Sequence, residues 1–205
     1  MYCNNDDYVL LSLYYGYWEE VSRIIWCKIL EDFNINIILD IGSYNGIYAL
    51  IARKMKNIEI HTFEALYYNY ERIVKNCKLN NYNDIINHNL AISNENNDVL
   101  FKYNHCNHAN TTGGMIVLKK DDKQQYLKVK CNKIDNIIKK KNQIILIKLD
   151  VEGNEINSLN GMKTLLLNNN FIILIEILSK VINNINIIKN ILKEKICYSY
   201  KIIEN

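Results

Sequence analysis

The sequence predicts an α/β fold built on a mostly parallel, doubly wound β-sheet. Short apolar runs rich in β-branched residues recur along the chain, and amphipathic stretches of helical length separate them. Runs with almost no polar alternation are typical of strands buried on both faces. Strands that alternate with helices are typical of right-handed βαβ units. A glycine-containing turn directly after the first run adds a third indication.

The predicted elements begin with a helix over Gly16 to Asp32. Six strands follow, at Ile37–Ile41, Ile58–Phe63, Ile85–Leu90, Ile144–Leu149, Phe171–Ile177 and Cys197–Ile203. The stretches IYALIARKM and LYYNYERIVKNCKL read as helices between the first three strands. We therefore expect an N-terminal helical segment, residues 1–36, and a following domain, residues 37–205, in a single-domain protein.

The regular alternation breaks once, between Ser93 and Ile134. There the runs VLFKYN and YLKVKC predict a hairpin or an edge pair, and the segment HCNHANTTGGMIVLKKDDKQ lies between them. Long connections inside compact domains are often functional. We expect this inserted hairpin and loop to lie near a binding site.

Composition excludes several classes of protein. The net charge is only +3, and the basic residues form no stripe, so a nucleic-acid partner is not favoured. Six cysteines are scattered without a CxxC pair, which indicates free thiols in a reducing compartment. The first residues are acidic and Gly16 interrupts them, so we expect neither a signal peptide nor a membrane span. These features predict a cytoplasmic protein and leave a homo-oligomer open.

The stretch LDIGSYNGIYAL, Leu39 to Leu50, has the form of a ligand-binding turn between a strand and a helix. Glycines there allow a tight bend and a close approach of the backbone, and the first amides of the helix point at a ligand. Glu64 follows the second strand, where a carboxylate can accept hydrogen bonds from ribose hydroxyls. The combination predicts a nucleoside-binding site.

The spacing of the turn favours one nucleoside over another. The pattern is Gly-x-x-x-Gly, not the G-x-G-x-x-G of dinucleotide sites. Asp40, directly before the glycines, would repel a phosphate and suit a cationic ligand. S-adenosylmethionine is cationic and carries no phosphate, so the charge argument favours it over NAD.

From about Ile37 to Ile177 the chain resembles the FkbM-like S-adenosylmethionine-dependent methyltransferases. The motifs that carry the resemblance are LDIGSYNG, TFEALYYNYERIVKNCKLNN, NLAISN, IKLDVEGNE, LNGM and IILIEI. It implies a Rossmann-like class I methyltransferase fold and, as for many members of that family, methylation of hydroxyl groups, often on sugars. Two positions depart from the family pattern: Tyr44 replaces a usual Asn, and Ala65 a usual Pro.

The resemblance also implies roles for individual residues. The turn, with Asp40, Gly42, Ser43, Tyr44 and Gly46, would hold the methionine portion of the cofactor. Glu64 would hold the ribose, and the adenine would be bordered by Asn89 or its neighbours Leu90 and Ala91. Asp150 and Glu152 would lie beside the reacting centre.

The predicted catalytic groups lie at the same edge of the sheet. Asp150 ends the fourth strand and Glu176 the fifth. Since an ordinary Asp has a pKa near 3.9, we favour acceptor orientation or metal ligation for Asp150 over proton abstraction. Lys148 is in phase with Asp150, which suggests a buried pair.

Further candidates lie in the insertion. His105 and His108 are candidate bases, because a histidine pKa suits neutral operation. No ligand spacing typical of zinc is present, so we predict no metal site, and a divalent metal stays open without support. Glu155, at a predicted helix start, has a structural role in this interpretation.

The sequence therefore predicts an S-adenosylmethionine-dependent O-methyltransferase that acts on a hydroxyl of a sugar or glycan precursor. Alternatives are a methyltransferase acting on RNA ribose or another small molecule, a nucleotide-sugar or NAD oxidoreductase, and a non-catalytic methyltransferase-like module, for which Tyr44 is the hint. The chain has no proline, which excludes the Asn/Asp-Pro-Pro-aromatic motif of enzymes that methylate base amino groups.

Overall fold

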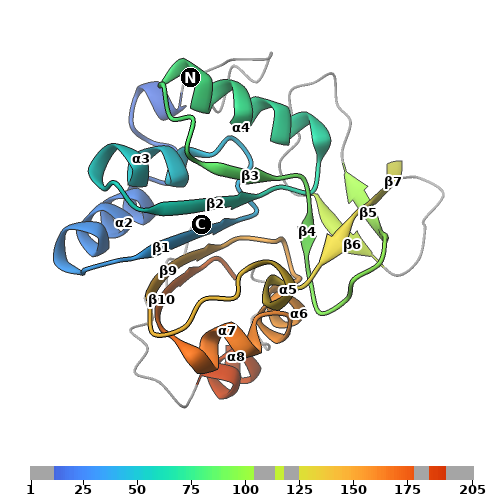
Figure 1. Ribbon diagram of the computed structural model, residues 1–205. Helices are drawn as coiled ribbons and strands as arrows, with labels where there is room; N and C mark the ends of the chain where they lie inside the picture. The colour runs from blue at the N-terminus through green and yellow to red at the C-terminus, as the bar shows by residue number, and fades with distance from the viewer. Residues whose placement is uncertain (1–11, 104–113, 118–124, 178–184, 193–205) are drawn as a thin grey trace.

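A five-stranded parallel sheet forms the centre of the protein (Figure 1). The computed structural model describes residues 12–103, 114–117, 125–177 and 185–192. The strand order is β10 (Asn170–Ile175), β9 (Ile144–Leu149), β1 (Ile37–Ile41), β2 (Glu59–Phe63) and β3 (Ile86–His88). The parallel central sheet of the predicted Rossmann-like fold is confirmed.

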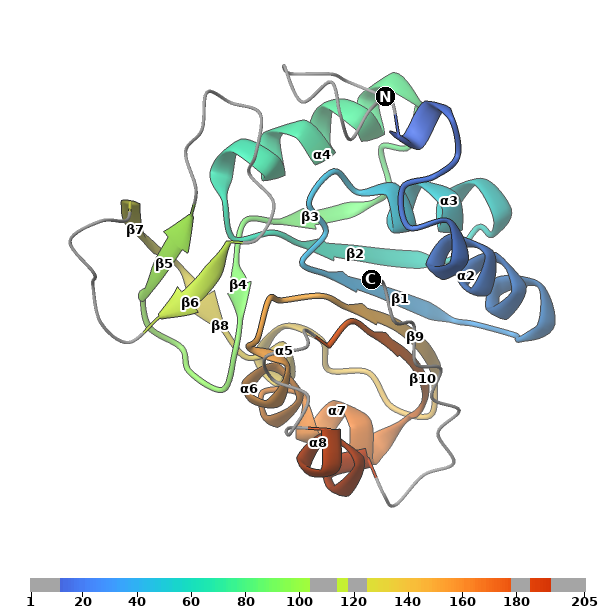
Figure 2. The same ribbon diagram turned by 180° about the vertical axis from the view of Figure 1, so that it is seen from behind.

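Helices cover both faces of this sheet, as the two opposite views show (Figures 1 and 2). One layer contains α2 (Glu20–Asp32), α3 (Ile47–Met55) and α4 (Tyr67–Leu79), and the other contains α5 (Ile134–Ile137), α6 (Glu155–Asn160), α7 (Lys163–Asn168) and α8 (Ile185–Leu192). Among the described residues, no helix has the length and apolar composition that crossing a bilayer requires.

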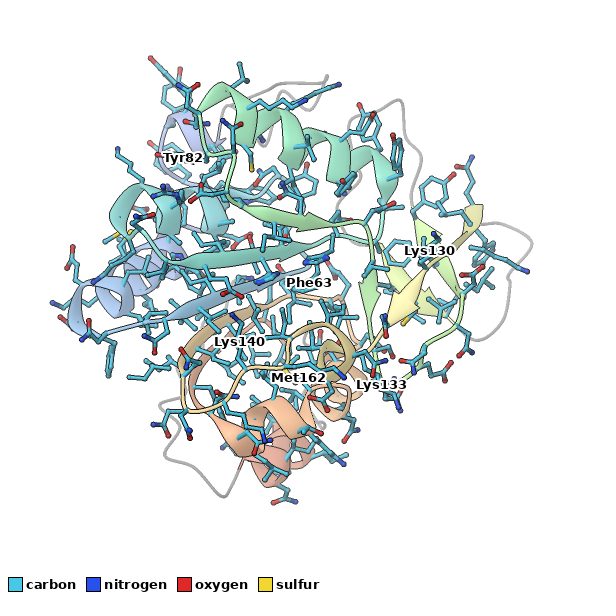
Figure 3. All side chains as sticks on the ribbon, in the orientation of Figure 1. Phe63, Tyr82, Lys130, Lys133, Lys140 and Met162 are labelled. Carbon is cyan, nitrogen blue, oxygen red and sulfur yellow. The ribbon has the colours of Figure 1, made fainter. Side chains whose placement is uncertain are left out.

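The two-residue period of the strands divides the core into two halves. Ile37, Leu39 and Ile41 of β1 pack in one hydrophobic cluster, whereas Ile38 belongs to the other. The first cluster lies against α5–α8 and includes Phe63 and Met162, both labelled in Figure 3. Both faces of the sheet are thus buried, which is why its strands lack polar alternation.

A second group of strands lies beyond the carboxyl ends of β1–β3 (Figure 1). β5 (Val99–Tyr103) pairs antiparallel with β6 (Met115–Val117) on one side and β7 (Gln125–Val129) on the other. β4 (Ala91–Ile92) and β8 (Cys131–Asn132) form a short parallel pair. The predicted hairpin is confirmed, with β6 as an additional strand.

The predicted strands agree with the structure, with changes at their ends. β1 and β9 have the predicted bounds, whereas β2, β3 and β10 begin or end one to two residues away from them. β3 stops at His88 because the Asn89 side chain turns back and donates to the carbonyls of Glu64 and Ala65, at 2.9 and 3.1 Å. The predicted strand Cys197–Ile203 lies outside the described residues.

The first helix begins later than predicted, at Glu20 instead of Gly16. Gly16 and Glu19 have φ angles of 83° and 46°, in the left-handed region, which a continuous α-helix cannot contain. The guanidinium of Arg23 stabilises this bend by donating to the carbonyl oxygens of Trp18 (2.7 Å) and Gly16 (2.6 Å). The expected helix over Gly16–Asp32 was therefore wrong in its first turn.

β1 and β9 meet closely at the point where the chain reverses its winding direction. The Asp150 amide donates to the Ile41 carbonyl at 3.0 Å, and Gly42 adopts a φ of +80° beside it. A Cβ atom at Gly42 would lie 1.7 Å from the Asp150 carbonyl oxygen. Only glycine therefore fits between the two strand ends.

This close approach predicts a large cost for Gly42→Ala. The left-handed backbone should cost about 1–2 kcal/mol of unfolding free energy and the clash about 1–3 more. Gly16→Ala is the matched control, since Gly16 has a φ of +83° with nothing within 4 Å of an added Cβ. Urea unfolding should show only the smaller loss for the control. Equal losses would show that the clash is absent.

Candidate active site

A cavity of about 410 Å³ lies at this reversal point, beyond the carboxyl ends of the strands. Its volume is within the range of roughly 300–1,000 Å³ that small-molecule sites occupy. Ligands of doubly wound sheets bind at this position. The predicted site residues in its wall are Gly42, Tyr44, Glu64, Leu90, Ala91, Asp150, Glu152 and Glu176.

The backbone around the cavity holds Glu64 in a fixed orientation. Its Oε2 accepts the Tyr44 amide and its Oε1 the Leu66 amide, both at 2.9 Å. Burial raises the pKa of this carboxyl to about 7, against these hydrogen bonds, which lower it. The side chain of Asn69 also donates to this carboxylate, so three protein groups fix its orientation in the cavity wall.

Two residues of the glycine turn shape it without lining the cavity. The Ser43 hydroxyl donates to the Asp40 carbonyl at 2.6 Å and accepts the Phe63 amide at 3.1 Å. The Gly46 amide donates to the Ser43 carbonyl at 2.7 Å, and a Cβ there would lie 3.1 Å from Ile73. Both residues hold the turn close to β2 and α4.

Asp40 lies beneath the turn and does not line the cavity. The side chain is buried; its Oδ2 accepts the Ala49 amide at 3.3 Å, and its Oδ1 has no hydrogen-bond partner among the described residues. Burial raises the pKa of Asp40 to about 7, although the charge of Lys148 opposes this. Its role toward the cofactor stays a prediction, and in the structure the carboxyl contacts the start of α3.

Tyr44 forms part of the cavity wall. Its backbone is left-handed, with a φ of 50°, which turns its amide toward Glu64. Its ring lies 6.5 Å from the Trp18 ring and 5.1 Å from the guanidinium carbon of Arg72. The residue that departs from the family pattern thus stands beside the 410 Å³ cavity as an aromatic wall.

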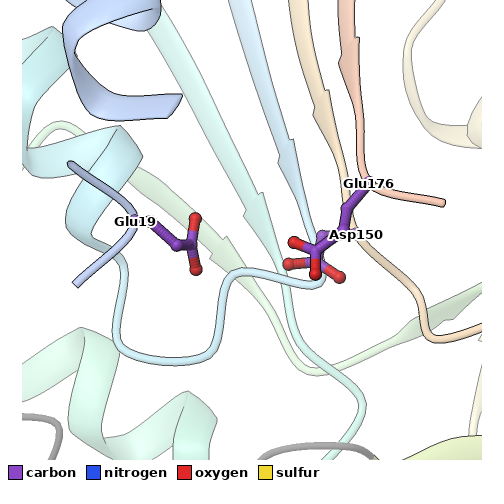
Figure 4. Close-up of side chains that lie close together, drawn as sticks. All are labelled: Glu19, Asp150 and Glu176. Carbon is purple, nitrogen blue, oxygen red and sulfur yellow. The ribbon is translucent and has the colours of Figure 1, made fainter. Parts of the chain in front are cut away.

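Three carboxylates from separate parts of the chain converge on the ammonium of Lys148. Its Nζ lies 3.1 Å from Asp150 Oδ2, 3.7 Å from Glu176 Oε2 and 4.0 Å from Glu19 Oε2. Figure 4 shows Glu19 facing Asp150 and Glu176, which point toward one another. The predicted Lys148–Asp150 pair is confirmed.

Burial and charge act in opposite directions on this lysine. Burial lowers the pKa of Lys148, but the nearby carboxylates, Asp150 first, raise it to about 12. The ammonium is 3% exposed and stays charged at neutral pH. It is therefore a permanent counter-ion for the cluster.

Glu176 differs from its neighbours in its ease of ionisation. Burial, and then the negative charge of Asp150, raise the pKa of Glu176 to about 8, and a hydrogen bond to Asp150 adds to this effect. Glu176 therefore holds a proton more readily than an ordinary glutamate does. In its ionised form it can take up a proton from a bound hydroxyl.

The carboxylate oxygens of Glu19, Asp150 and Glu176 all lie within 4.8 Å of one another, so they could hold a cation. The ammonium of Lys148 already lies within 4.0 Å of all three. A divalent ion would have to share these oxygens with it.

Comparison with known proteins gives the family. The sequence matches the description "Methyltransferase FkbM domain" over residues 40–192. The chain belongs to the FkbM methyltransferase domain family. Comparison with curated proteins gave no match.

Solved structures similar to this FkbM domain were also found. Methyltransferase FkbM from Methylobacillus flagellatus KT is 17% identical with a TM-score of 0.41, and the match covers 63% of this chain and 29% of that chain. Precorrin-6y C5,15-methyltransferase from Geobacter metallireducens GS-15 is 9% identical with a TM-score of 0.49, over 85% of this chain and 70% of that one. Ribosomal protein L11 methylase from Lactobacillus delbrueckii subsp. bulgaricus is 13% identical with a TM-score of 0.46, over 85% and 68%.

The other predicted site residues of this FkbM domain that the structure describes do not line the cavity. Asn89 lies behind the wall, where it supports Glu64 and Ala65, as described above. Glu155 accepts the Gly153 amide at 2.8 Å at the start of α6, as expected for a structural carboxylate. His105 and His108 lie outside the described residues.

Sequence reasoning missed the part of the wall upstream of the family match. Ser12, Tyr17, Trp18 and Glu19 line the cavity. Phe101, Gly114 and Ile116 line it as well, and they belong to the inserted segment between Ser93 and Ile134 that the sequence predicts to lie near a binding site. A continuous helix from Gly16 would have placed Glu19 in an ordinary first turn. The pair of left-handed residues, with only Gly16 as a sequence signal, directs it to Lys148 instead.

The buried Asp40 predicts a dependence of stability on pH. Its folded pKa of about 7 lies above the value near 4 of an unfolded Asp, so the folded state holds more protons between these values. This stability is fully present below pH 4 and is lost as the pH rises through 7. Asp40→Asn should therefore lose less stability than wild type between pH 5 and 8 in urea unfolding.

The exposed Asp98 provides a control, since Asp98→Asn makes the same replacement of a carboxyl by an amide at the protein surface. Its unfolding free energy should follow the wild-type pH profile. A wild-type profile in Asp40→Asn would show that Asp40 does not carry the effect.

Proposed function

We propose that this protein is an S-adenosylmethionine-dependent methyltransferase that transfers the methyl group to a hydroxyl of a sugar or glycan precursor. The observation that carries the proposal is the cavity at the reversal point of an FkbM domain, with the fixed Glu64 in its wall.

The charges of the wall suit this cofactor. The described wall residues include Glu19, Glu64, Asp150, Glu152 and Glu176, and no Lys, Arg or His. A pyrophosphate would meet these carboxylates without a cation to bind it, which argues against NAD. A cationic ligand without phosphate would be attracted. When bound, S-adenosylmethionine supplies an activated methyl group on a positively charged sulfur.

The positions of the wall residues suggest how the cofactor is held. Glu64 would accept a ribose hydroxyl with the acceptor position that Tyr44, Leu66 and Asn69 leave open. Leu90 and Ala91, which follow β3 in the wall, would border the adenine. Gly42 also lines the cavity, and it carries no side chain because a Cβ would clash with the Asp150 carbonyl oxygen. Its backbone would therefore lie close to the methionine portion of the cofactor.

The cluster around Lys148 would act on the acceptor. Alignment of reacting groups can contribute roughly 7–11 kcal/mol to such a transfer. Asp150, held by Lys148 at 3.1 Å, would orient the acceptor hydroxyl. Glu176, with a pKa of about 8, would take its proton, because a base with a pKa near the working pH is the most effective.

Calorimetry tests the cofactor. The protein should bind S-adenosylhomocysteine and not NAD, and Glu64→Gln should weaken that binding by about 1–3 kcal/mol, because one acceptor oxygen becomes a donor. The exposed Glu71→Gln is the control and should bind as wild type does. A thermal melt of each variant shows that it is folded. Unchanged affinity in Glu64→Gln would refute the ribose role, and tighter binding of NAD would refute the cofactor.

The pH dependence of methyl transfer tests the base. Glu176 is protonated below its pKa of about 8, so the rate should rise as the pH increases through that value. Glu176→Gln should remove this rise and lower the rate by roughly 10²–10⁴-fold. Transfer of labelled methyl groups to the best acceptor from a panel of sugars, lipids and RNA measures both. A variant that keeps the wild-type profile would exclude Glu176 as the base.

A further inference from the structure

We propose that the turn Tyr17–Glu19 forms the acceptor subsite and selects an uncharged sugar ring that carries no phosphate. The proposal rests on the methyltransferase function proposed above. It assigns the specificity of the enzyme to residues upstream of the matched family domain, residues 40–192.

The location of the turn is the first argument. Tyr17, Trp18 and Glu19 lie in the same cavity wall as Asp150 and Glu176. The predicted cofactor contacts Glu64, Leu90 and Ala91 follow β2 and β3, whereas Asp150 and Glu176 follow β9 and β10. The turn therefore stands on the side of the cavity where an acceptor would meet the proposed base.

Three aromatic side chains, those of Tyr17, Trp18 and Tyr44, line this part of the cavity. The Trp18 and Tyr44 rings lie 6.5 Å apart and are inclined by only 33°, so they form one continuous wall. Tyr17 beside them is 74% exposed. Aromatic faces carry a negative potential, which attracts the C–H groups on the apolar face of a sugar ring. Such a wall suits a flat, ring-shaped acceptor.

Glu19 adds a hydrogen-bonding group beside that wall. One of its oxygens accepts the Tyr48 hydroxyl and also faces Lys148, which fixes the side chain. Ionised carboxylates accept hydrogen bonds from hydroxyls. Glu19 and Asp150 can thus bind neighbouring hydroxyls of one ring that stacks on Trp18.

The charge of the wall decides between classes of sugar. Its described residues provide five carboxyls and no basic group, while the ammonium of Lys148 lies buried behind them. A phosphate on the ring would approach these carboxylates without a partner. Repulsion of this kind selects against the wrong ligand. The wall therefore discriminates against sugar phosphates and nucleotide sugars, and it accepts a ring without phosphate.

The fluorescence of Trp18 serves as the reporter in the test. The other tryptophan of the chain, Trp26, is fully buried in the core, so a fluorescence change on adding ligand is assigned to Trp18. The protein is saturated with S-adenosylhomocysteine and titrated with methyl glycosides of common hexoses and deoxyhexoses, and separately with the corresponding hexose 6-phosphates. Calorimetry measures the same affinities without relying on fluorescence.

At least one methyl glycoside should bind, and its phosphorylated counterpart should bind at least about tenfold more weakly. Trp18→Ala should weaken glycoside binding by about tenfold, and Trp18→Phe should restore much of it, because a ring remains to stack on. Glu19→Gln should weaken it as well. Tyr14→Ala removes an exposed aromatic residue of the same segment that does not line the cavity, and should change nothing.

Three results would overturn the proposal: no methyl glycoside binds, the phosphates bind equally well, or Trp18→Ala leaves glycoside affinity unchanged. Binding of S-adenosylhomocysteine is measured first for every variant. If the wild-type protein does not bind S-adenosylhomocysteine, the proposed methyltransferase function is refuted. If it binds this compound but no methyl glycoside, only the proposed acceptor subsite is refuted. Retained cofactor binding in Trp18→Ala also shows that this variant is folded.

Discussion

The electrostatics of the cavity depend on one buried ammonium group. Asp150, Glu176 and Glu19 come from β9, from the end of β10 and from the N-terminal turn, and Lys148 is their shared counter-ion. Its charge offsets part of their mutual repulsion, although the pKa of Glu176 still rises to about 8. Lys148 lies on β9 and precedes Asp150 by two residues, so both side chains lie on the same face of the chain. The register of the sheet thereby places the counter-ion beside the carboxyl groups of the cavity.

Features that depend on local periodicity could be predicted from the sequence. Unbroken apolar runs predicted β1 and β9, the two-residue period of a strand predicted the Lys148–Asp150 pair, and the spacing of glycines located the turn. Features that depend on depth could not be predicted. Asp40 is adjacent in sequence to the turn, yet it lies below the wall, because β1 is covered by α3 on that face. Adjacency along a chain does not determine which layer a side chain enters.

The N-terminal turn shows a second limit of sequence reasoning. The apolar pattern of α2 continues upstream, so the sequence predicts a helix that begins at Gly16. Its actual start depends on the Arg23 guanidinium, which binds two carbonyl oxygens of the preceding turn. These contacts, five and seven residues apart, outweigh the helical pattern here, and Gly16 is the sequence signal for the bend. The same bend brings Tyr17 and Trp18 to the cavity wall, upstream of the matched residues 40–192.

The hydrogen bonds from Arg23 to the backbone make the shape of the turn independent of its side chains. Because this guanidinium binds main-chain carbonyls and not side chains, we expect the turn to keep its shape when the residues at positions 17 and 18 are replaced. Substitutions at positions 17 and 18 would therefore change the surface that faces the cavity without moving the turn, whereas Gly42 at the end of β1 leaves no room for a side chain.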